Sequence, residues 1–141
     1  MEIRALHEGD DRSRFASGDA DLDRFFHKYA GQNQFRHHLG VTYVALQDRQ
    51  ILGFATISPA HVEIDNLPTA ARKQLPHYPL PVLRLARLAI DQTAQGQGLG
   101  AQLLRFVIGM ARRMADEYGC VGVIVDSKPT ATGFYANYGF V

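Results

Sequence analysis

The sequence predicts an α/β (α+β) domain over residues 1–141, in which a curved mixed sheet carries helices on both faces. Three observations predict this fold class. Two apolar stretches, residues 41–46 and 51–57, flank the polar segment 47–50 and indicate a β-hairpin. Residues 85–90 are apolar enough for a buried strand, and a glycine-rich loop joins them to a helix. Residues 121–125 predict a further strand after that helix.

The first half of the chain contains one more helix. Ser17 or Asp19 can cap it at its N-terminus. Its apolar side consists of Leu22, Phe25, Phe26 and Tyr29. Prolines then punctuate residues 59–81, where we expect a short helix near residues 69–75.

The second half is built around a long amphipathic helix. Its apolar residues recur at three- and four-residue steps, as one helical face requires. They are Leu103, Leu104, Val107, Met110, Ala111 and Met114. Pro129 interrupts the chain after the strand at residues 121–125, and residues 134–140 predict a short helix that a glycine closes.

The junction between strand 85–90 and the long helix is the strongest functional signal. Residues 95–100 have the sequence QGQGLG, with three glycines. Glycine lets the backbone turn tightly and approach a ligand closely, because it has no Cβ. The free N–H groups of the new helix point toward one place, where the helix dipole also favours an anion. The junction therefore predicts a pyrophosphate site.

Other phosphate sites fit this loop less well. The chain lacks Gly-Lys-Ser/Thr, so the P-loop of nucleoside triphosphatases is excluded. Gly96, Gly98 and Ala101 satisfy the dinucleotide pattern as a string, but that motif belongs in the first strand–helix turn of a longer fold. A glycine-rich helix start without any ligand is the remaining alternative.

Composition limits the other functions. The formal net charge is +1, so a nucleic acid or anionic lipid would need a local basic patch. Apolar runs are too short to span a membrane, and the N-terminus is too charged for a signal peptide. Cys120 is the only cysteine, which excludes an internal disulfide, suits a small core residue and fits a cytoplasmic protein.

Two segments resemble the signatures of the GNAT N-acetyltransferase superfamily. Gln95, Gly98 and Gly100 match its acetyl-CoA motif Gln/Arg-x-x-Gly-x-Gly/Ala, and residues 134–140 resemble its Phe-Tyr-x-x-x-Gly-Phe motif. The resemblance implies the GNAT fold, with acetyl-CoA as co-substrate and no metal. It also implies that the backbone of Leu88, Ala89 and Ile90 binds the pantetheine arm. The pyrophosphate would bind to Gln95, Gly96, Gln97, Gly98, Leu99, Gly100 and Ala101.

Four further segments resemble one GNAT branch, the acetyltransferase toxins of bacterial type II toxin–antitoxin modules. They are residues 17–23 (SGDADLD), 30–34 (AGQNQ), 79–82 (PLPV) and 85–91 (LARLAID). This resemblance implies acetylation of the α-amino group of aminoacyl-tRNA, which blocks translation, and a ribbon–helix–helix antitoxin as partner. The family's domain continues into a last strand, whereas this chain stops at Val141. We therefore expect an unpaired sheet edge that favours a homodimer or a complex with the antitoxin.

Acetyl transfer to an amine also needs a proton for the departing thiolate. Tyr135 stands where the family carries its general acid, and a phenol with pKa about 10 stays protonated at neutral pH. Packing beside Phe134 is the structural alternative for this ring. No residue is an obvious general base, since His61, Glu63, Asp91 and Asp126 all suit solvated or capping roles. An α-amino group, with pKa about 7.7–8.0, is partly neutral at pH 7 and needs little help.

Several basic residues are candidates for a surface that faces tRNA, although acids interleave them and a mixed solvated surface is the alternative. They are Arg24, Lys28, Arg36, His37, His38, Arg72, Lys73, Arg84 and Arg87. Arg105 is a candidate for a phosphate of coenzyme A or for a solvated helix residue. Two other functions compete with the toxin: a GNAT enzyme acting on a small amine or protein N-terminus, and an inactive acyl-CoA-binding or antitoxin-binding protein.

Overall fold

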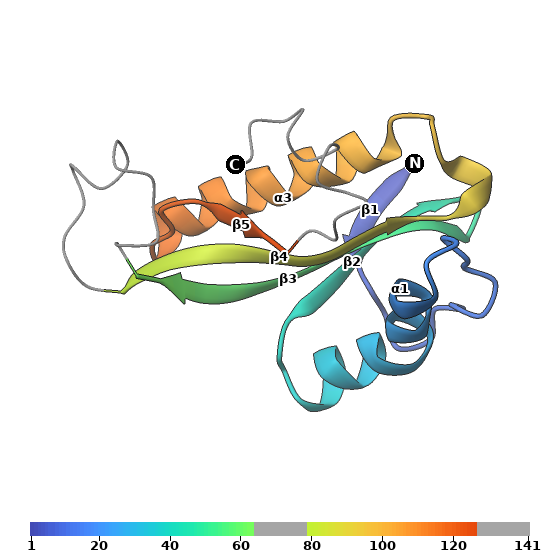
Figure 1. The fold of residues 1–141 in the computed structure, drawn as a ribbon, viewed down its shortest axis with the longest axis horizontal. Coiled ribbons are helices and arrows are strands. Elements are labelled where there is room, and N and C mark those ends of the chain that lie inside the picture. Colours follow the sequence, from blue (N-terminus) through green and yellow to red (C-terminus); the bar gives the residue numbers. More distant parts are fainter. Residues whose placement is uncertain (64–78, 127–141) are drawn as a thin grey trace.

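The computed structural model describes residues 1–63 and 79–126, and these build one mixed five-stranded sheet (Figure 1). Its order is β1-β2-β3-β4-β5, with antiparallel neighbours from β1 to β4 and a parallel pair β4–β5. The strands are β1 (Glu2–Ala5), β2 (Val41–Gln47), β3 (Gln50–Val62), β4 (Leu80–Ile90) and β5 (Val123–Val125). The mixed sheet predicted from the sequence is confirmed. The short helices expected near residues 69–75 and 134–140 lie outside the described residues.

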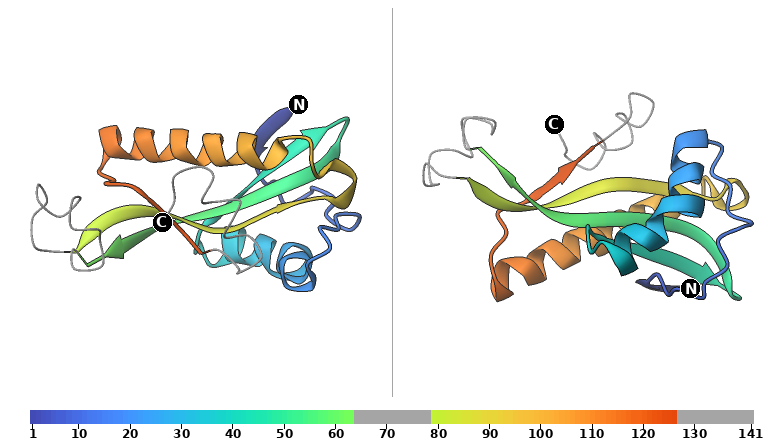
Figure 2. Two further views of the ribbon diagram at one scale, coloured as in Figure 1. Left: turned by 45° about the horizontal axis from the view of Figure 1, so that its top comes forward. Right: turned by 90° about the horizontal axis from the view of Figure 1, so that it is seen from below.

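Helices cover both faces of this sheet, as predicted (Figures 1 and 2). On one face α3 packs against β3 and β4. On the other face lie three consecutive helical segments near the N-terminus, whose first segment contacts β4 and whose last contacts β2. The helices are α1 (Ala20–Arg24), η1 (Phe25–Tyr29), η2 (Gln32–Arg36), η4 (Gln92–Ala94) and α3 (Leu99–Glu117).

The predicted apolar face of α3 forms the larger core. Leu103, Leu104 and Val107 are at most 1% exposed and pack with Leu83 and Leu85 of β4. Burying side chains of this size contributes about 1.5–3 kcal/mol each, which is what attaches α3 to the sheet.

The N-terminal helical segments bury an aromatic cluster on the opposite face. Asp19 caps α1, since its side chain accepts hydrogen bonds from the N–H groups of Asp21 and Leu22. The ring of Phe26 is fully buried and stacks on Phe54 of β3, with centroids 4.4 Å apart. Rings therefore lie at the centre of this core, and aliphatic residues such as Val44, Leu46 and Ile51 complete it.

One residue of this helix was predicted wrongly. Tyr29 was expected on the apolar side, but its side chain is 44% exposed, and Ala30 is buried instead. The cause is a π-helical geometry over Phe25–Tyr29, in which the N–H of Ala30 donates to the carbonyl of Phe25. Hydrogen bonds to the fifth preceding residue widen each turn, so the apolar positions fall one residue later than in an α-helix.

The predicted hairpin is confirmed and extends further than expected. Its turn places Asp48 and Arg49 at φ 52° and 67°, the left-handed geometry of tight hairpin turns. β3 continues past Ile57, its last residue that pairs with β2, and includes Pro59. Pro59 pairs with Leu83, whose own N–H donates to Gly122 on the far side. The absent N–H of Pro59 therefore points away from β4, beyond the end of β2, and no ladder bond is lost.

A β-bulge divides β4 into two halves. Thr56 of β3 pairs with Arg87, whereas the next residue, Ile57, pairs with Leu85, so Ala86 is an extra residue in β4. A bulge of this kind reverses the alternation of a strand. Leu83 and Leu85 pack toward α3 before the bulge, and Leu88 and Ile90 do so after it.

Candidate active site

The two halves of β4 serve different partners on the edge away from β3. In the first half, Leu83 donates its N–H to Gly122, and Leu85 accepts from the N–H of Asp126. In the second half, the N–H of Asp91 donates to Leu52 of β3, so by alternation the polar groups of Leu88 and Ile90 point away from β3. Within the described part of the chain, β5 pairs only with Leu83, Arg84 and Leu85.

Within the described residues, the second half of β4 therefore presents backbone groups that no other strand pairs with along one edge. The Ile90 carbonyl accepts a hydrogen bond from Gln95 Nε2 at 2.9 Å. Among the residues that the structure describes, no strand pairs with the N–H and C=O of Leu88 or the N–H of Ile90. An extended amide-containing arm can add there as a further strand. Ala89, the third predicted pantetheine contact, directs its backbone groups to β3 and its side chain into the aromatic core.

The glycine-rich loop leads from this edge into the start of α3. Gly96 and Gly98 have φ values of 78° and 82°, which only glycine adopts readily. Gly98 is the N-cap of α3, where neither a side-chain cap nor an acidic residue of the first turn occupies the free N–H groups. A Cβ built at either glycine would meet no atom of residues 1–63 and 79–126 within 4 Å, so this part of the chain leaves the space beside the two glycines open. The residues present therefore fit an anionic group such as a pyrophosphate.

The start of this loop is held by a buried carboxylate. Asp91 is 4% exposed and accepts three hydrogen bonds, from the N–H of Ala16 at 2.9 Å, the N–H of Thr93 at 3.0 Å and the hydroxyl of Thr93 at 2.6 Å. Burial alone raises the pKa of Asp91, but the hydrogen bonds from Thr93 and Ala16 outweigh it and hold that pKa below its ordinary value. The sequence predicted a solvated or capping role, and the structure shows the capping role, at the N-terminus of η4.

The other candidate residues lie elsewhere on the surface or outside the residues that the structure describes. Tyr135 lies beyond the described residues, as do Arg72 and Lys73. His61, Glu63 and Asp126 are exposed, and Asp126 forms an ion pair with Arg84. Arg105 is exposed on α3.

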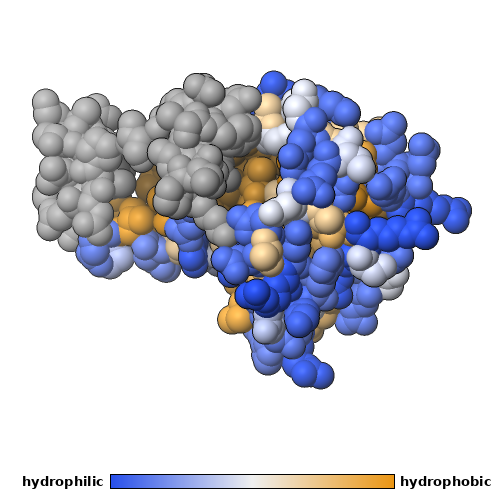
Figure 3. All heavy atoms as spheres, turned by 45° about the vertical axis from the view of Figure 1, so that its right-hand side comes forward, coloured by the Kyte–Doolittle hydropathy of each residue, from blue (hydrophilic) through white to orange (hydrophobic). Residues whose placement is uncertain are grey.

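Every described residue of the predicted basic surface is exposed, and some of them have side-chain partners. Arg24 pairs with Asp21, and Arg87 lies over the ring of Phe25 at 3.8 Å. Lys28, Arg36, His37 and His38 are exposed. Figure 3, turned toward the loop between β4 and α3, shows mostly hydrophilic residues on the described surface and a smaller hydrophobic group at its centre.

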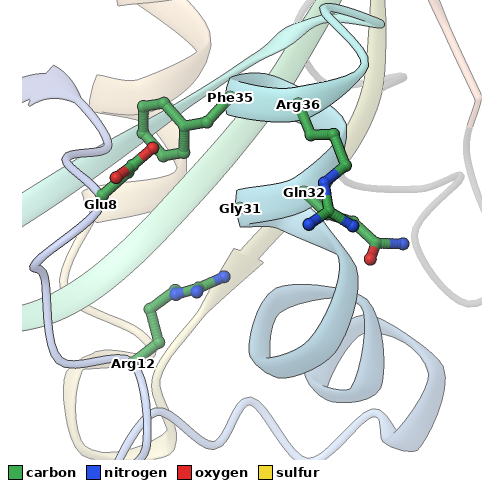
Figure 4. A pocket seen from close by; sticks show the side chains of 6 residues that line it. All are labelled: Glu8, Arg12, Gly31, Gln32, Phe35 and Arg36. Atoms are coloured by element: carbon green, nitrogen blue, oxygen red, sulfur yellow. The ribbon is translucent and has the colours of Figure 1, made fainter.

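A separate pocket of about 630 Å³ lies beside η2, away from the glycine-rich loop (Figure 4). Arg12 reaches toward the helix and donates to the Phe26 carbonyl at 2.9 Å, which fixes its guanidinium. Gly31 permits this approach, because a Cβ there would lie 3.0 Å from Arg12 Nη2. The lining residues are Glu8, Arg12, Gly31, Gln32, Phe35 and Arg36.

The fold and the loop together define the class of protein. Residues 38–141 match the acetyltransferase (GNAT) domain family, and the chain belongs to this family. It is thus an acetyl-CoA-dependent N-acetyltransferase. The antiparallel order of β1 to β4 also excludes the parallel sheet that a dinucleotide fold would require.

Individual relatives narrow this class. A tRNA-acetylating toxin of Mycobacterium tuberculosis is 34% identical over 140 residues, which are 97% of this chain and 82% of the toxin. The solved structure of AtaT complexed with acetyl-methionyl-tRNAfMet has a TM-score of 0.90 at 28% identity, covering 99% of this chain and 86% of AtaT. A tyrosine-to-phenylalanine mutant of AtaT, bound to the C-terminus of the antitoxin AtaR and to acetyl-CoA, has a TM-score of 0.83 at 28% identity, with coverage of 99% and 83%.

Residues 1–63 and 79–126 show neither a membrane-spanning helix nor a metal-binding cluster. None of their helices is both long and apolar enough to cross a membrane. Nor do three His, Cys, Asp or Glu side chains gather there in a group that could hold a metal ion.

Proposed function

We propose that this chain acetylates the α-amino group of aminoacyl-tRNA and acts as the toxin of a toxin–antitoxin pair. The observation that carries the proposal is the likeness to a tRNA-acetylating toxin over 97% of the chain. The edge of β4 that no described strand covers, followed by the N-terminus of α3, supports the proposal as a site where acetyl-CoA would bind.

Two groups of backbone atoms would bind the co-substrate, which supplies the acetyl group as a thioester. The N–H and C=O of Leu88 and the N–H of Ile90 would hold the pantetheine arm as an added strand. The N–H groups from Gln97 to Ala101 would hold the pyrophosphate, favoured by the positive end of α3. Gln95 would serve indirectly, because its side chain already bonds to the carbonyls of Ser17 and Ile90.

The chemistry requires one bond to form and one to break. The amine nitrogen attacks the thioester carbon, the new N–C bond replaces the C–S bond, and the amine releases a proton to water. Tyr135 would donate its phenolic proton to the departing thiolate and recover one from solvent. An α-amino group, unlike a lysine side chain with pKa about 10.4, reaches its reactive neutral form at pH 7 without a dedicated base.

Acetylated aminoacyl-tRNA would block translation, so this function places the protein in the cytoplasm. The AtaT–AtaR complex supports an antitoxin as partner. We further propose that the antitoxin is of the ribbon–helix–helix type, that the chain forms a homodimer, and that residues 1–141 constitute one domain.

The test is incubation of the purified protein with labelled acetyl-CoA and charged bulk tRNA, followed by identification of the labelled aminoacyl group. We expect label in the aminoacyl fraction and none in uncharged tRNA. Label only in free amines or in protein N-termini would replace this function with that of another GNAT acetyltransferase. Binding of acetyl-CoA without transfer to any of these acceptors would identify an inactive acyl-CoA-binding protein.

A further inference from the structure

We infer that Asp91 is a positioning residue, which fixes the acetyl-CoA loop by tying it to the segment that begins α1. This inference rests on the proposed acetyl-CoA site at residues 95–101. It concerns a residue that does not contact the co-substrate in that proposal and acts through the loop instead.

The first hydrogen bonds that connect the loop to the segment before α1 are made by the carboxylate of Asp91. Its Oδ1 accepts from the N–H of Ala16, which is 75 positions away in sequence, and its Oδ2 accepts both donors of Thr93. The backbone of the next residue repeats the connection, since the N–H of Gln92 donates to the Ala16 carbonyl at 2.8 Å. Because Asp91 is buried, water cannot replace these partners without opening the structure.

Further hydrogen bonds extend this connection from Asp91 toward the glycine-rich loop and toward α1. Toward the co-substrate, Gln95 Nε2 bonds to the carbonyls of Ser17 and Ile90 at 2.8 and 2.9 Å, so it joins the N-terminal segment to β4. Toward α1, the N–H and hydroxyl of Ser17 both donate to Asp23 Oδ1, at 2.9 and 2.7 Å. Gly18 fits against the side chain of Gln92, where a Cβ would lie 2.8 Å from Nε2.

These contacts make α1, residues 16–18 and the start of the loop one connected unit. The free N–H groups at the N-terminus of α3 bind an anion well only when the loop before them has one fixed conformation. Loss of the Asp91 carboxylate would leave α3 packed by its own core but release residues 92–98. Binding of acetyl-CoA would then carry the cost of ordering this loop.

Asp91→Asn is the isosteric test, and Asp10→Asn is its control. Asp10 also accepts three hydrogen bonds, two from Arg4 and one from the N–H of His7, but none of these partners belongs to the loop. We expect Asp91→Asn to raise the Kd and KM for acetyl-CoA about tenfold, because an amide donor would face the donors of Thr93. We expect kcat at saturating acetyl-CoA to change by less than about twofold, and Asp10→Asn to leave Kd and KM unchanged.

The split between KM and kcat separates positioning from mere stability. A purely structural role would lower the active fraction, so kcat would fall and KM would stay constant. Three results would overturn the inference. They are a lower kcat with constant KM, an unchanged Kd for acetyl-CoA in folded Asp91→Asn, and an equal rise in Kd for Asp10→Asn. If Asp91→Asn does not fold, Thr93→Val removes only the hydroxyl donor and must still raise Kd, by about threefold. A wild-type protein that does not bind acetyl-CoA would instead overturn the proposed function.

Discussion

Substitution of Gly98 tests whether the N-terminus of α3 binds an anion. A Cβ at this position would meet no atom of the described residues within 4 Å, so the start of a side chain there causes no clash with that part of the chain. Its φ of 82° costs most L-residues about 1–2 kcal/mol, and Asp and Asn tolerate this region better than other residues. Gly98→Asp and Gly98→Asn should therefore both fold, with a similar loss of about 1 kcal/mol in the free energy of unfolding.

The two variants differ in charge and hardly in shape. Two like charges about 4 Å apart repel by about 4 kcal/mol at an effective dielectric constant of 20. Gly98 is exposed, so we discount the repulsion between the new carboxylate and the pyrophosphate by half, to about 2 kcal/mol. Acetyl-CoA should therefore bind Gly98→Asp about 30-fold more weakly than Gly98→Asn.

Isothermal titration calorimetry measures this ratio directly. The difference in acetyl-CoA affinity between the two variants should shrink as salt is added, because ions screen an exposed charge. If both variants bind acetyl-CoA equally at low salt, no phosphate lies near this helix terminus and the assignment of residues 95–101 is wrong.

Three further predictions concern other parts of the chain. Tyr135→Phe should lower single-turnover acetylation of charged tRNA by about 10²–10⁴-fold and leave the Kd for acetyl-CoA unchanged; near-normal turnover, equal to that of Tyr138→Phe, would contradict its role as acid. Gly109→Ala in α3 should raise Tm by a few degrees in calorimetry, because a Cβ there meets no described residue within 4 Å and alanine favours a helix by about 0.5–1 kcal/mol; a lower Tm would show a hidden clash. Hydrogen bonds from Arg4 hold the pKa of Asp10 below its ordinary value, so Asp10 stabilises the fold above about pH 4 and loses this effect as pH falls. In urea titrations Asp10→Asn should thus be less stable than wild type at pH 7 and approach it below pH 4, whereas a constant gap would refute the assignment.

Local periodicity predicted the elements that depend on it. The buried face of α3 follows from its apolar spacing, and the β2–β3 hairpin follows from two apolar stretches around a polar turn. β1 was missed because it is only four residues long, alternates with Glu2 and Arg4, and forms a strand by pairing with β2. Short segments of this kind take their structure from their neighbours in space.

Some residues of the candidate site could also be predicted from the sequence, whereas others could not. The role of its glycines was evident from the sequence, because a backbone with positive φ favours glycine, as at Gly96 and Gly98. The role of Asp91 was not evident, since its partner Ala16 is distant in sequence and offers only a backbone N–H. Every residue has such a group, so no side-chain pattern could have revealed this contact.

The extra residue in β4 has a consequence for how the protein can vary. Ala86 shifts the alternation of β4 by one residue. On the edge away from β3, the backbone groups therefore belong to odd-numbered residues where β4 pairs with β5, and to even-numbered residues beside the proposed pantetheine site. Deletion of Ala86 alone would remove the bulge and restore regular alternation, so Leu88 and Ile90 would still face α3 and Arg87 would still face the aromatic cluster. The strand can therefore lose its bulge residue without reversing its faces, whereas a one-residue insertion or deletion elsewhere in β4 would turn every residue beyond it to the opposite face.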